Sequence, residues 1–145
     1  MTRSVAQRAW HVLRFVINLP ITVPAVLWGL LHGGTPDLRP GLFISCGNMH
    51  GGYAKGGTTW GNVWLFGHLE SPERLRHEAR HATQWAVCTP VLFPFLYLAA
   101  ELLGRRDPTR NVFERLADLV DGGYVAGPPL HPRSSPRTTS TNDLW

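Results

Sequence analysis

The sequence has few charged residues and almost no lysine. Asp, Glu, Lys and Arg make up 17 % of its 145 residues, against about 25 % in an average soluble domain. Lys55 is the only lysine, so the net charge of +4 comes from arginine. These arginines lack interleaved aromatic residues and match no nucleic-acid-binding motif. We therefore expect no nucleic-acid partner, and anionic lipid headgroups are at least as good a partner for the arginines.

Cysteine is also scarce. Neither Cys46 nor Cys88 belongs to a C-x-x-C pair, which argues against a structural zinc site built on cysteine. One disulfide between them is conceivable in an oxidising compartment, although a single pair is weak evidence. The glycine-rich stretch from Gly47 to Gly57 lacks the G-x-x-x-x-G-K-[ST] spacing of a phosphate-binding loop. At 145 residues, the chain is long enough for one domain with one core.

The N-terminal region is apolar. Residues 15–31 form an uncharged run after three arginines, and its 17 residues are at the lower limit for a membrane span. Pro20 and Pro24 weaken a straight helix, and the run lacks a clear signal-peptide cleavage site. The pattern predicts an uncleaved membrane anchor or an in-plane helix over residues 1–34, with a buried soluble helix as the alternative. If it spans, the arginines hold the N-terminus on the cytoplasmic side.

The next segments read as β-structure. Pro36–Pro40 indicates a break, and Gly41–Cys46 and Thr58–Phe66 are rich in β-branched or aromatic residues and bounded by glycine. The stretch between them predicts a hairpin loop. Thr58–Phe66 is either an edge strand that pairs with an extended peptide or a half-buried strand that covers the following helix.

The central motif is His77-Glu78-Ala79-Arg80-His81, an H-E-x-x-H pattern. Residues four apart lie on the same face of a helix, so His77 and His81 can bind one metal ion, and Gln84 shares that face. Glu78 lies beside the metal and can act as a general base toward bound water. The alternative is a pair of surface histidines on a charged helix.

The helix that carries this motif has a clear start. Ser71 is a cap, Pro72 is tolerated at the first helical position and Glu73 favours the positive helix end. The helix is expected to run through Trp85 or a little beyond, and to stop before Pro90. Its small apolar face is formed by Leu75, Ala79, Ala82 and Ala86. Its three arginines, Arg74, Arg76 and Arg80, are most simply read as solvated.

A catalytic zinc site needs a third protein ligand. The best source is a helical segment over residues 111–118, in which Glu114 and Asp118 are one turn apart. Glu114 is the expected ligand, and the Asp118 carboxylate is expected to accept the N–H on the far side of His77 or His81. By itself this segment also reads as an ordinary exposed helix face. The rival ligands are His68, His50, Asp121 and Glu101.

Two further segments frame that helix. The apolar residues 91–100 are too short to cross a bilayer and read as a re-entrant, interfacial or core segment. Asp107 or Thr109 can cap the helix that follows. Residues 126–145 are rich in Pro, Ser and Thr, which predicts a disordered tail.

These motifs resemble a known group of proteins. The H-E-x-x-H helix, an apolar stretch and then Arg110-x-x-x-Glu114-x-x-Ala117-Asp118 resemble the membrane metallopeptidases of the CAAX prenyl protease and HtpX heat-shock type. With Gln84 included, the helix is also similar to small bacterial zincin-like domains with H-E-x-x-H-x-x-Q. The resemblance covers roughly residues 58–124. It implies zinc bound by His77, His81 and Glu114, with Glu78 as the catalytic base.

We therefore expect an α+β, zincin-like domain over residues 35–125. It has a β-hairpin before the motif helix and a ligand-bearing C-terminal helix. The expected activity is zinc-dependent hydrolysis of a peptide or protein substrate at a membrane, for which the bacterial inner membrane is the expected location. Tyr124 is the candidate for stabilising the oxyanion, with His68 and Arg110 as alternatives. Two rival hypotheses are a non-catalytic envelope protein with a structural metal site and a basic membrane-surface module without metal.

Overall fold

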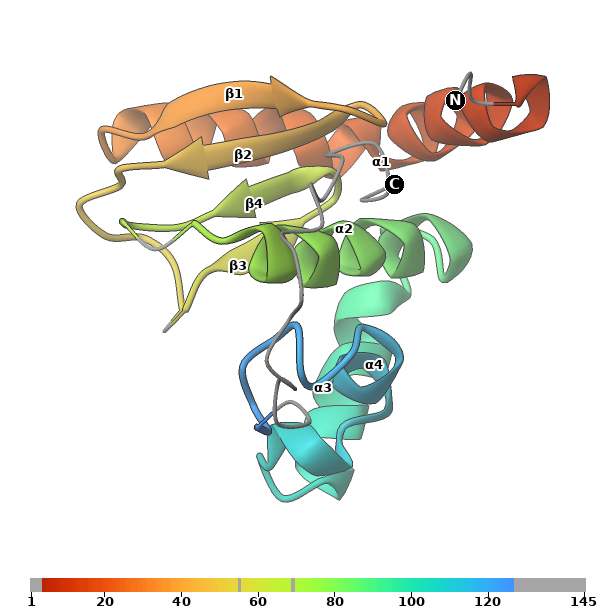
Figure 1. Cartoon of the computed structure of the whole chain (residues 1–145), viewed down its shortest axis with the longest axis vertical. Coiled ribbons are helices and arrows are strands. Elements are labelled where there is room, and N and C mark those ends of the chain that lie inside the picture. Colours follow the sequence, from red (N-terminus) through yellow and green to blue (C-terminus); the bar gives the residue numbers. More distant parts are fainter. Residues whose placement is uncertain (1–3, 55, 69, 127–145) are drawn as a thin grey trace, which may run out of the picture.

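The computed structural model describes residues 4–54, 56–68 and 70–126. This part of the chain forms four α-helices, a short 3-10 helix and a four-stranded mixed sheet (Figure 1). In chain order the elements are α1 (Val5–Leu31), β1 (Thr35–Arg39), β2 (Phe43–Gly47), β3 (Thr58–Trp60), β4 (Val63–Leu65), α2 (Pro72–Val87), α3 (Phe93–Leu103), the 3-10 helix Pro108–Arg110, and α4 (Val112–Leu116). The α+β class is as expected. The tail expected over residues 126–145 lies, apart from its first residue, outside the described residues.

The pairing of the strands corrects the expected hairpin. The sheet has the order β1-β2-β4-β3, and β2 pairs with β4 in parallel. The run Thr58–Phe66 is itself a hairpin, in which β3 and β4 are antiparallel and Trp60 lies opposite Val63. Gly61 takes a φ of +60° between them, as the first central position of a two-residue hairpin turn requires. A hairpin therefore precedes α2, but it is more local than predicted.

The expected break at Pro36–Pro40 is also corrected, because residues up to Arg39 belong to strand β1. This strand pairs antiparallel with β2, from Thr35 opposite Gly47 to Arg39 opposite Phe43. Proline is tolerated here because β1 is an edge strand, where one side of the backbone makes no ladder hydrogen bonds. The chain then turns back through Gly41, whose φ is +79°.

Helices cover both faces of the sheet, with α1 behind it and α2 in front in Figure 1. Because side chains alternate along a strand, β2 and β4 supply two separate sets of apolar residues. On one face Phe43, Trp64 and the following Phe66 pack with Leu75, Ala79 and Ala82 of α2. On the other face Cys46, Val63 and Leu65, with the nearby Met49, pack with Ala25 of α1. Helix α1 therefore shares a core with the sheet, although the sequence predicts residues 1–34 as a segment apart from the domain. Cys46 and Cys88 are both free.

The inward face of α1 is polar and its outward face is apolar. The buried residues are His11, Arg14, Asn18, Thr22, Ala25 and Gly29. Asn18 donates to the Asn62 side chain at 2.7 Å and to the Ala82 carbonyl at 2.9 Å, and the Thr22 hydroxyl accepts from the Asn62 amide at 3.0 Å. Arg14 donates to the Gly41 carbonyl at 2.8 Å, and burial lowers its pKa to about 10. Hydrogen bonds therefore fasten α1 to α2 and to both strand turns.

The helices α3 and α4 form a lobe below the sheet and α2 in Figure 1. The predicted helix over residues 111–118 is shorter than expected. Asn111 caps it by accepting from the Phe113 amide at 2.9 Å, and Asp107 caps the 3-10 helix before it. Ring contacts join the lobe to α2, since Phe93 packs on Trp85 with the ring centroids 4.8 Å apart. This lobe carries Glu114 to the motif helix.

Candidate metal centre

The motif helix begins as its local sequence predicts. The Ser71 hydroxyl accepts from the Arg74 amide at 3.2 Å, Pro72 is the first helical residue and Glu73 lies in the first turn. The helix ends at Val87. Its predicted apolar face is buried, with Leu75, Ala79, Ala82 and Ala86 each less than 7 % exposed. This packing turns the opposite face, with both histidines, toward the lobe.

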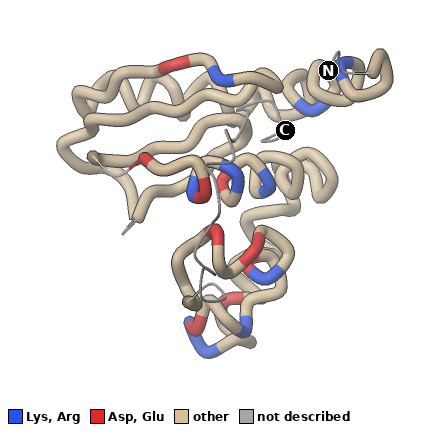
Figure 2. The backbone as a smooth tube through the Cα atoms, viewed as in Figure 1, with Lys and Arg blue, Asp and Glu red and all other residues tan. Residues whose placement is uncertain are grey.

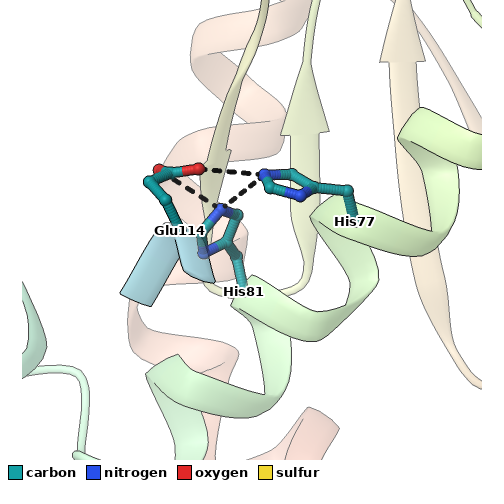
Figure 3. Close-up of side chains that lie close together, drawn as sticks. All are labelled: His77, His81 and Glu114. Atoms are coloured by element: carbon teal, nitrogen blue, oxygen red, sulfur yellow. Dashed lines mark hydrogen bonds and ion pairs between the residues drawn. The ribbon is translucent and has the colours of Figure 1, made fainter. Parts of the chain in front are cut away.

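His77, His81 and Glu114 come together as a buried group (Figure 3). The His77 Nε2 lies 3.0 Å from a Glu114 carboxylate oxygen and 3.1 Å from the His81 Nε2. The His81 Nε2 lies 3.5 Å from the other Glu114 oxygen. The side chains come from α2 and α4, 33 or more positions apart in the sequence, and point toward one another.

The hydrogen bonds on the far side of each ring fix which nitrogen carries a hydrogen. The His77 Nδ1 lies 2.8 Å from the main-chain carbonyl of Asp118, which can only accept. The His81 Nδ1 lies 2.8 Å from the Gln84 side-chain oxygen, whose orientation is set because the amide nitrogen donates to the Phe113 carbonyl. In both neutral rings the Nε2 atom therefore presents a lone pair to the centre.

Glu114 brings negative charge to these lone pairs. Its burial alone would raise the carboxyl pKa, but the contacts with the His77 and His81 imidazoles outweigh burial and hold that pKa well below its usual range. Burial likewise acts to lower the pKa of His81, and the hydrogen bond and charge of Glu114 reverse this and raise it. Two lone pairs and a carboxylate at about 3 Å need a cation between them, either a proton or a metal ion.

The spacing of the ligand atoms is compatible with a metal ion. Ligands at about 2.05 Å from a tetrahedral ion lie about 3.3 Å from one another. The His77 Nε2 lies 3.0 Å from one Glu114 oxygen and 3.1 Å from the His81 Nε2, close to that value, and the His81 Nε2 lies 3.5 Å from the other Glu114 oxygen. One ligand atom from each residue lies within 4.8 Å of the others, so the group is placed to hold a metal ion.

Asp118 contributes differently from what was predicted. The acceptor for His77 is its main-chain carbonyl, whereas its carboxylate accepts from the main-chain amides of Val120 and Asp121. The reason is local: Asp118 takes a φ of +78°, and the chain turns sharply after α4. The carboxylate stabilises that turn, and the turn directs the carbonyl at the imidazole.

The arginines of α2 are only partly exposed and bind other parts of the chain, which corrects the simplest interpretation of the sequence. Arg76 donates twice to the Asp121 carboxylate, at 3.0 and 3.3 Å. Arg80 donates to the same carboxylate at 2.8 Å and to the Ala117 carbonyl at 2.9 Å. Arg74 donates to the Gly122 carbonyl at 3.1 Å. Together they bind the segment after α4 to the motif helix, so Asp121 is an anchor and not a metal ligand.

Gly122 completes the wall behind His77. A Cβ atom at this position would lie 2.7 Å from Cε1 and 2.9 Å from Nδ1 of the His77 ring, closer than carbon atoms pack. Tyr124 follows, with its ring 5.8 Å from the His77 ring between centroids. Burial, followed by the charges of Glu114 and Glu78, raises the pKa of the Tyr124 phenol, so this group stays a hydrogen-bond donor at neutral pH.

Glu78 is buried next to the metal-binding group. One of its carboxylate oxygens accepts from the Thr59 hydroxyl at 2.7 Å, and its charge contributes to the raised pKa values of His81 and Tyr124. Thr59 belongs to the edge strand β3. Strand β3 therefore fixes the position of the Glu78 carboxylate, the group that the sequence predicts as the general base.

The rival ligands lie elsewhere. His68 lines a polar cavity of about 240 Å³ that is bordered by β1, β2 and Glu70. The His50 Nδ1 lies 3.2 Å from the His32 carbonyl. Arg110, an alternative for stabilising the oxyanion, pairs with Asp107 at 3.5 Å, and its side chain is 63 % exposed. Glu101 is half-buried on α3 and does not belong to the group that can hold a metal ion.

Three residues of the centre were missed from the sequence. The Tyr97 hydroxyl donates to Glu114, and this contact joins α3 to the ligand. Thr59 holds Glu78, and Gly122 makes room for His77. For Tyr97 a weak signal exists, because it is the one tyrosine in an otherwise apolar run, and a buried phenol needs a partner. Thr59 and Gly122 give no signal in the sequence.

The fold and the site thus define an α+β protein with a buried His-His-Glu group that can hold a metal ion. Comparison with protein-family models, with curated proteins and with solved structures finds no match. Function is therefore argued from the centre itself.

Proposed function

We propose that this protein is a zinc-dependent peptidase in which His77, His81 and Glu114 bind the ion. The observation that carries the proposal is the forced convergence of two imidazole lone pairs and an ionised carboxylate. Two histidines and one glutamate are a ligand set of catalytic zinc sites, which leave a fourth position for water. The resemblance to membrane metallopeptidases and small zincin-like domains supports the same choice of metal.

When bound, zinc would supply Lewis-acid chemistry and lower the pKa of a water molecule to about 7. Glu78 would take the proton from that water, because it lies next to His77 in the chain and its carboxylate is held by Thr59 at 2.7 Å. Anchoring one oxygen leaves the other to carry the proton. Tyr124 and Tyr97 stay protonated at neutral pH, because burial raises both pKa values. Tyr124 is our candidate donor to the oxyanion of the substrate.

The test combines metal content with peptide hydrolysis. Wild type, Glu78→Gln and the control Glu73→Gln would be prepared with zinc and assayed with casein and a quenched fluorescent peptide library. Glu73 is the control because it lies on the same helix with an exposed side chain. Glu78→Gln should retain zinc and lose at least about 100-fold in rate, while Glu73→Gln behaves as wild type. A wild-type protein that takes up no metal from zinc-containing buffer would refute the proposal.

A second candidate is a structural metal site without catalysis. The observation in its favour is burial, since His77 is 1 % and Glu114 is 3 % exposed. In that case His77→Ala lowers the melting temperature, and Glu78→Gln changes neither stability nor any activity. The two candidates differ in the effect of Glu78→Gln on peptide hydrolysis.

We also propose that the protein works at a membrane, with the bacterial inner membrane as the location that the resemblance suggests. By length and composition α1 is long and apolar enough to cross a bilayer. A core helix of a soluble protein meets the same criterion, so the contacts of α1 must decide how it is used.

A further inference from the structure

Helix α1 buries its polar side chains and exposes its apolar side chains, which is the reverse of a surface helix on a soluble protein. Between Val12 and Leu31 its only polar side chains are Arg14, Asn18 and Thr22, and all three are buried against the domain. A helix on a soluble protein shows the opposite arrangement, with its polar face toward water. Each of these side chains makes at least one hydrogen bond to a carbonyl, an amide or a side chain of the domain, so this arrangement is built into the fold.

The outward face is a continuous apolar stripe. Val12, Val16, Val23, Leu27 and Leu30 recur at helical spacing on the side opposite Asn18, and each is at least 50 % exposed. At 1.5 Å per residue the stripe is about 27 Å long. Exposed apolar surface of this extent marks a site of contact with an apolar partner.

The charges near α1 favour an anionic lipid surface as that partner. The first acidic residue of the chain is Asp37, and three arginines precede it. Figure 2 shows basic positions at the N-terminal end of α1 and no charged position along the rest of the helix. A second copy docked on the stripe would find no acid within it to pair with the exposed Arg8, whereas anionic headgroups attract an arginine near the surface. Arg14 is buried against the domain and does not take part.

The fold also decides the orientation of α1. Its contacts with the domain extend from His11 to Gly29, about 27 Å of the roughly 30 Å hydrocarbon core. If α1 crossed the bilayer, the sheet would be drawn into hydrocarbon with it. The edge strand β1 carries Asp37 and Arg39, with the Asp37 side chain 64 % exposed, and open sheet edges are not tolerated in that environment.

We infer that α1 lies in the plane of an anionic membrane, with its apolar stripe in one leaflet and the sheet and the metal centre on the aqueous side. The helix is then both an integral core element and the lipid-contacting surface, immersed by about 5–10 Å. This inference does not depend on the peptidase assignment, because none of the α1 side chains that carry it belongs to the metal centre.

Binding is tested by flotation of the full-length protein with vesicles of equal parts phosphatidylcholine and phosphatidylglycerol. The triple variant Val16→Gln, Val23→Gln, Leu27→Gln should reduce the partition coefficient by about 100-fold. The matched control Leu38→Gln, Val112→Gln, Leu116→Gln removes three apolar side chains of similar exposure from other elements. It should bind as wild type does, with or without chelator. Equal binding by the two variants, or no binding by wild type, would overturn the inference.

Orientation is tested with single nitroxide labels at Val16, Val23 and Leu30, after replacement of Cys46 by Ala and of Cys88 by Ser. Oxygen and nickel-chelate accessibility should give one common depth for an in-plane helix. A spanning helix would instead give depths that differ by up to about 21 Å over these positions. A stripe that buries itself in a dimer, seen by sedimentation without vesicles and abolished by the triple variant, would equally refute the lipid contact.

Discussion

Replacing Gly122 by alanine tests whether the wall behind His77 sets the metal geometry. Gly122 does not take a positive φ, so the substitution is expected to act through the space that the new Cβ would fill. The added Cβ would lie 2.7 Å from the His77 ring, and the ring must retreat by about 0.7 Å to reach an ordinary contact of about 3.4 Å. Metal–ligand distances tolerate only about 0.2 Å. We expect zinc affinity to fall about 10- to 100-fold and the metal-free protein to lose about 1–3 kcal/mol.

The assay is a chelator competition titration for zinc, with urea unfolding of the metal-free protein beside it. Gly51→Ala is the matched control, because nothing lies within 4 Å of a Cβ at that position. It should leave both quantities unchanged. Wild-type zinc affinity in Gly122→Ala, in a protein that still binds zinc stoichiometrically, would show that the ring can move freely, and the reasoning from a fixed imidazole would be wrong.

Three further predictions concern neighbouring groups. Gln84→Leu removes the acceptor of His81 and should lower zinc affinity about 10-fold or more, while Gln84→Glu keeps an acceptor and should retain most of it in the same titration. In metal-free protein the raised pKa of His81 means that its contribution to stability is fully present below about pH 6.5 and is lost as pH rises through the raised value. The lowered pKa of Glu114 has the opposite sign, with stability present above about pH 4.3 and lost as pH falls. The melting temperature of the metal-free protein, measured with chelator present, should therefore decline from pH 6 to about 8 in wild type and not in His81→Asn. Zinc affinity should instead rise over the same pH range, because only neutral imidazole coordinates the ion. Asn18→Leu leaves the Ala82 carbonyl without its donor and should cost about 1–3 kcal/mol in urea unfolding.

The motif helix could be predicted from the sequence because its signals are local. The cap at Ser71, the proline after it and the spacing of the two histidines all lie within one segment, and helices obey short-range rules. The third ligand, Glu114, was predicted by a chemical requirement, since a catalytic metal needs three protein ligands. The helix that carries Glu114 is shorter than predicted. Asn111 caps its N-terminus, and Asp118, with a φ of +78°, turns the chain shortly after its last residue.

The rest depended on tertiary contacts. Strands β2 and β4 pair in parallel although a loop and strand β3 lie between them in the sequence. No spacing of residues in the sequence predicts this pairing. Arg76 and Arg80 looked solvated because their partner, Asp121, lies about 40 residues later. The sequence of α1 suggested a membrane helix, but only the structure shows that its polar residues face inward.

The lobe formed by α3 and α4 is joined to α2 by the centre, by its arginine anchors and by the ring contact of Phe93 with Trp85. A bound ion would therefore act as a cross-link that closes a loop of more than 30 residues between His81 and Glu114, a constraint of about 4 kcal/mol on the unfolded chain. Because His77 is 1 % and Glu114 is 3 % exposed, we expect the ion to leave when this lobe swings away from the motif helix. Its residence time would then follow the rate of that opening and not the intrinsic rate of ligand exchange.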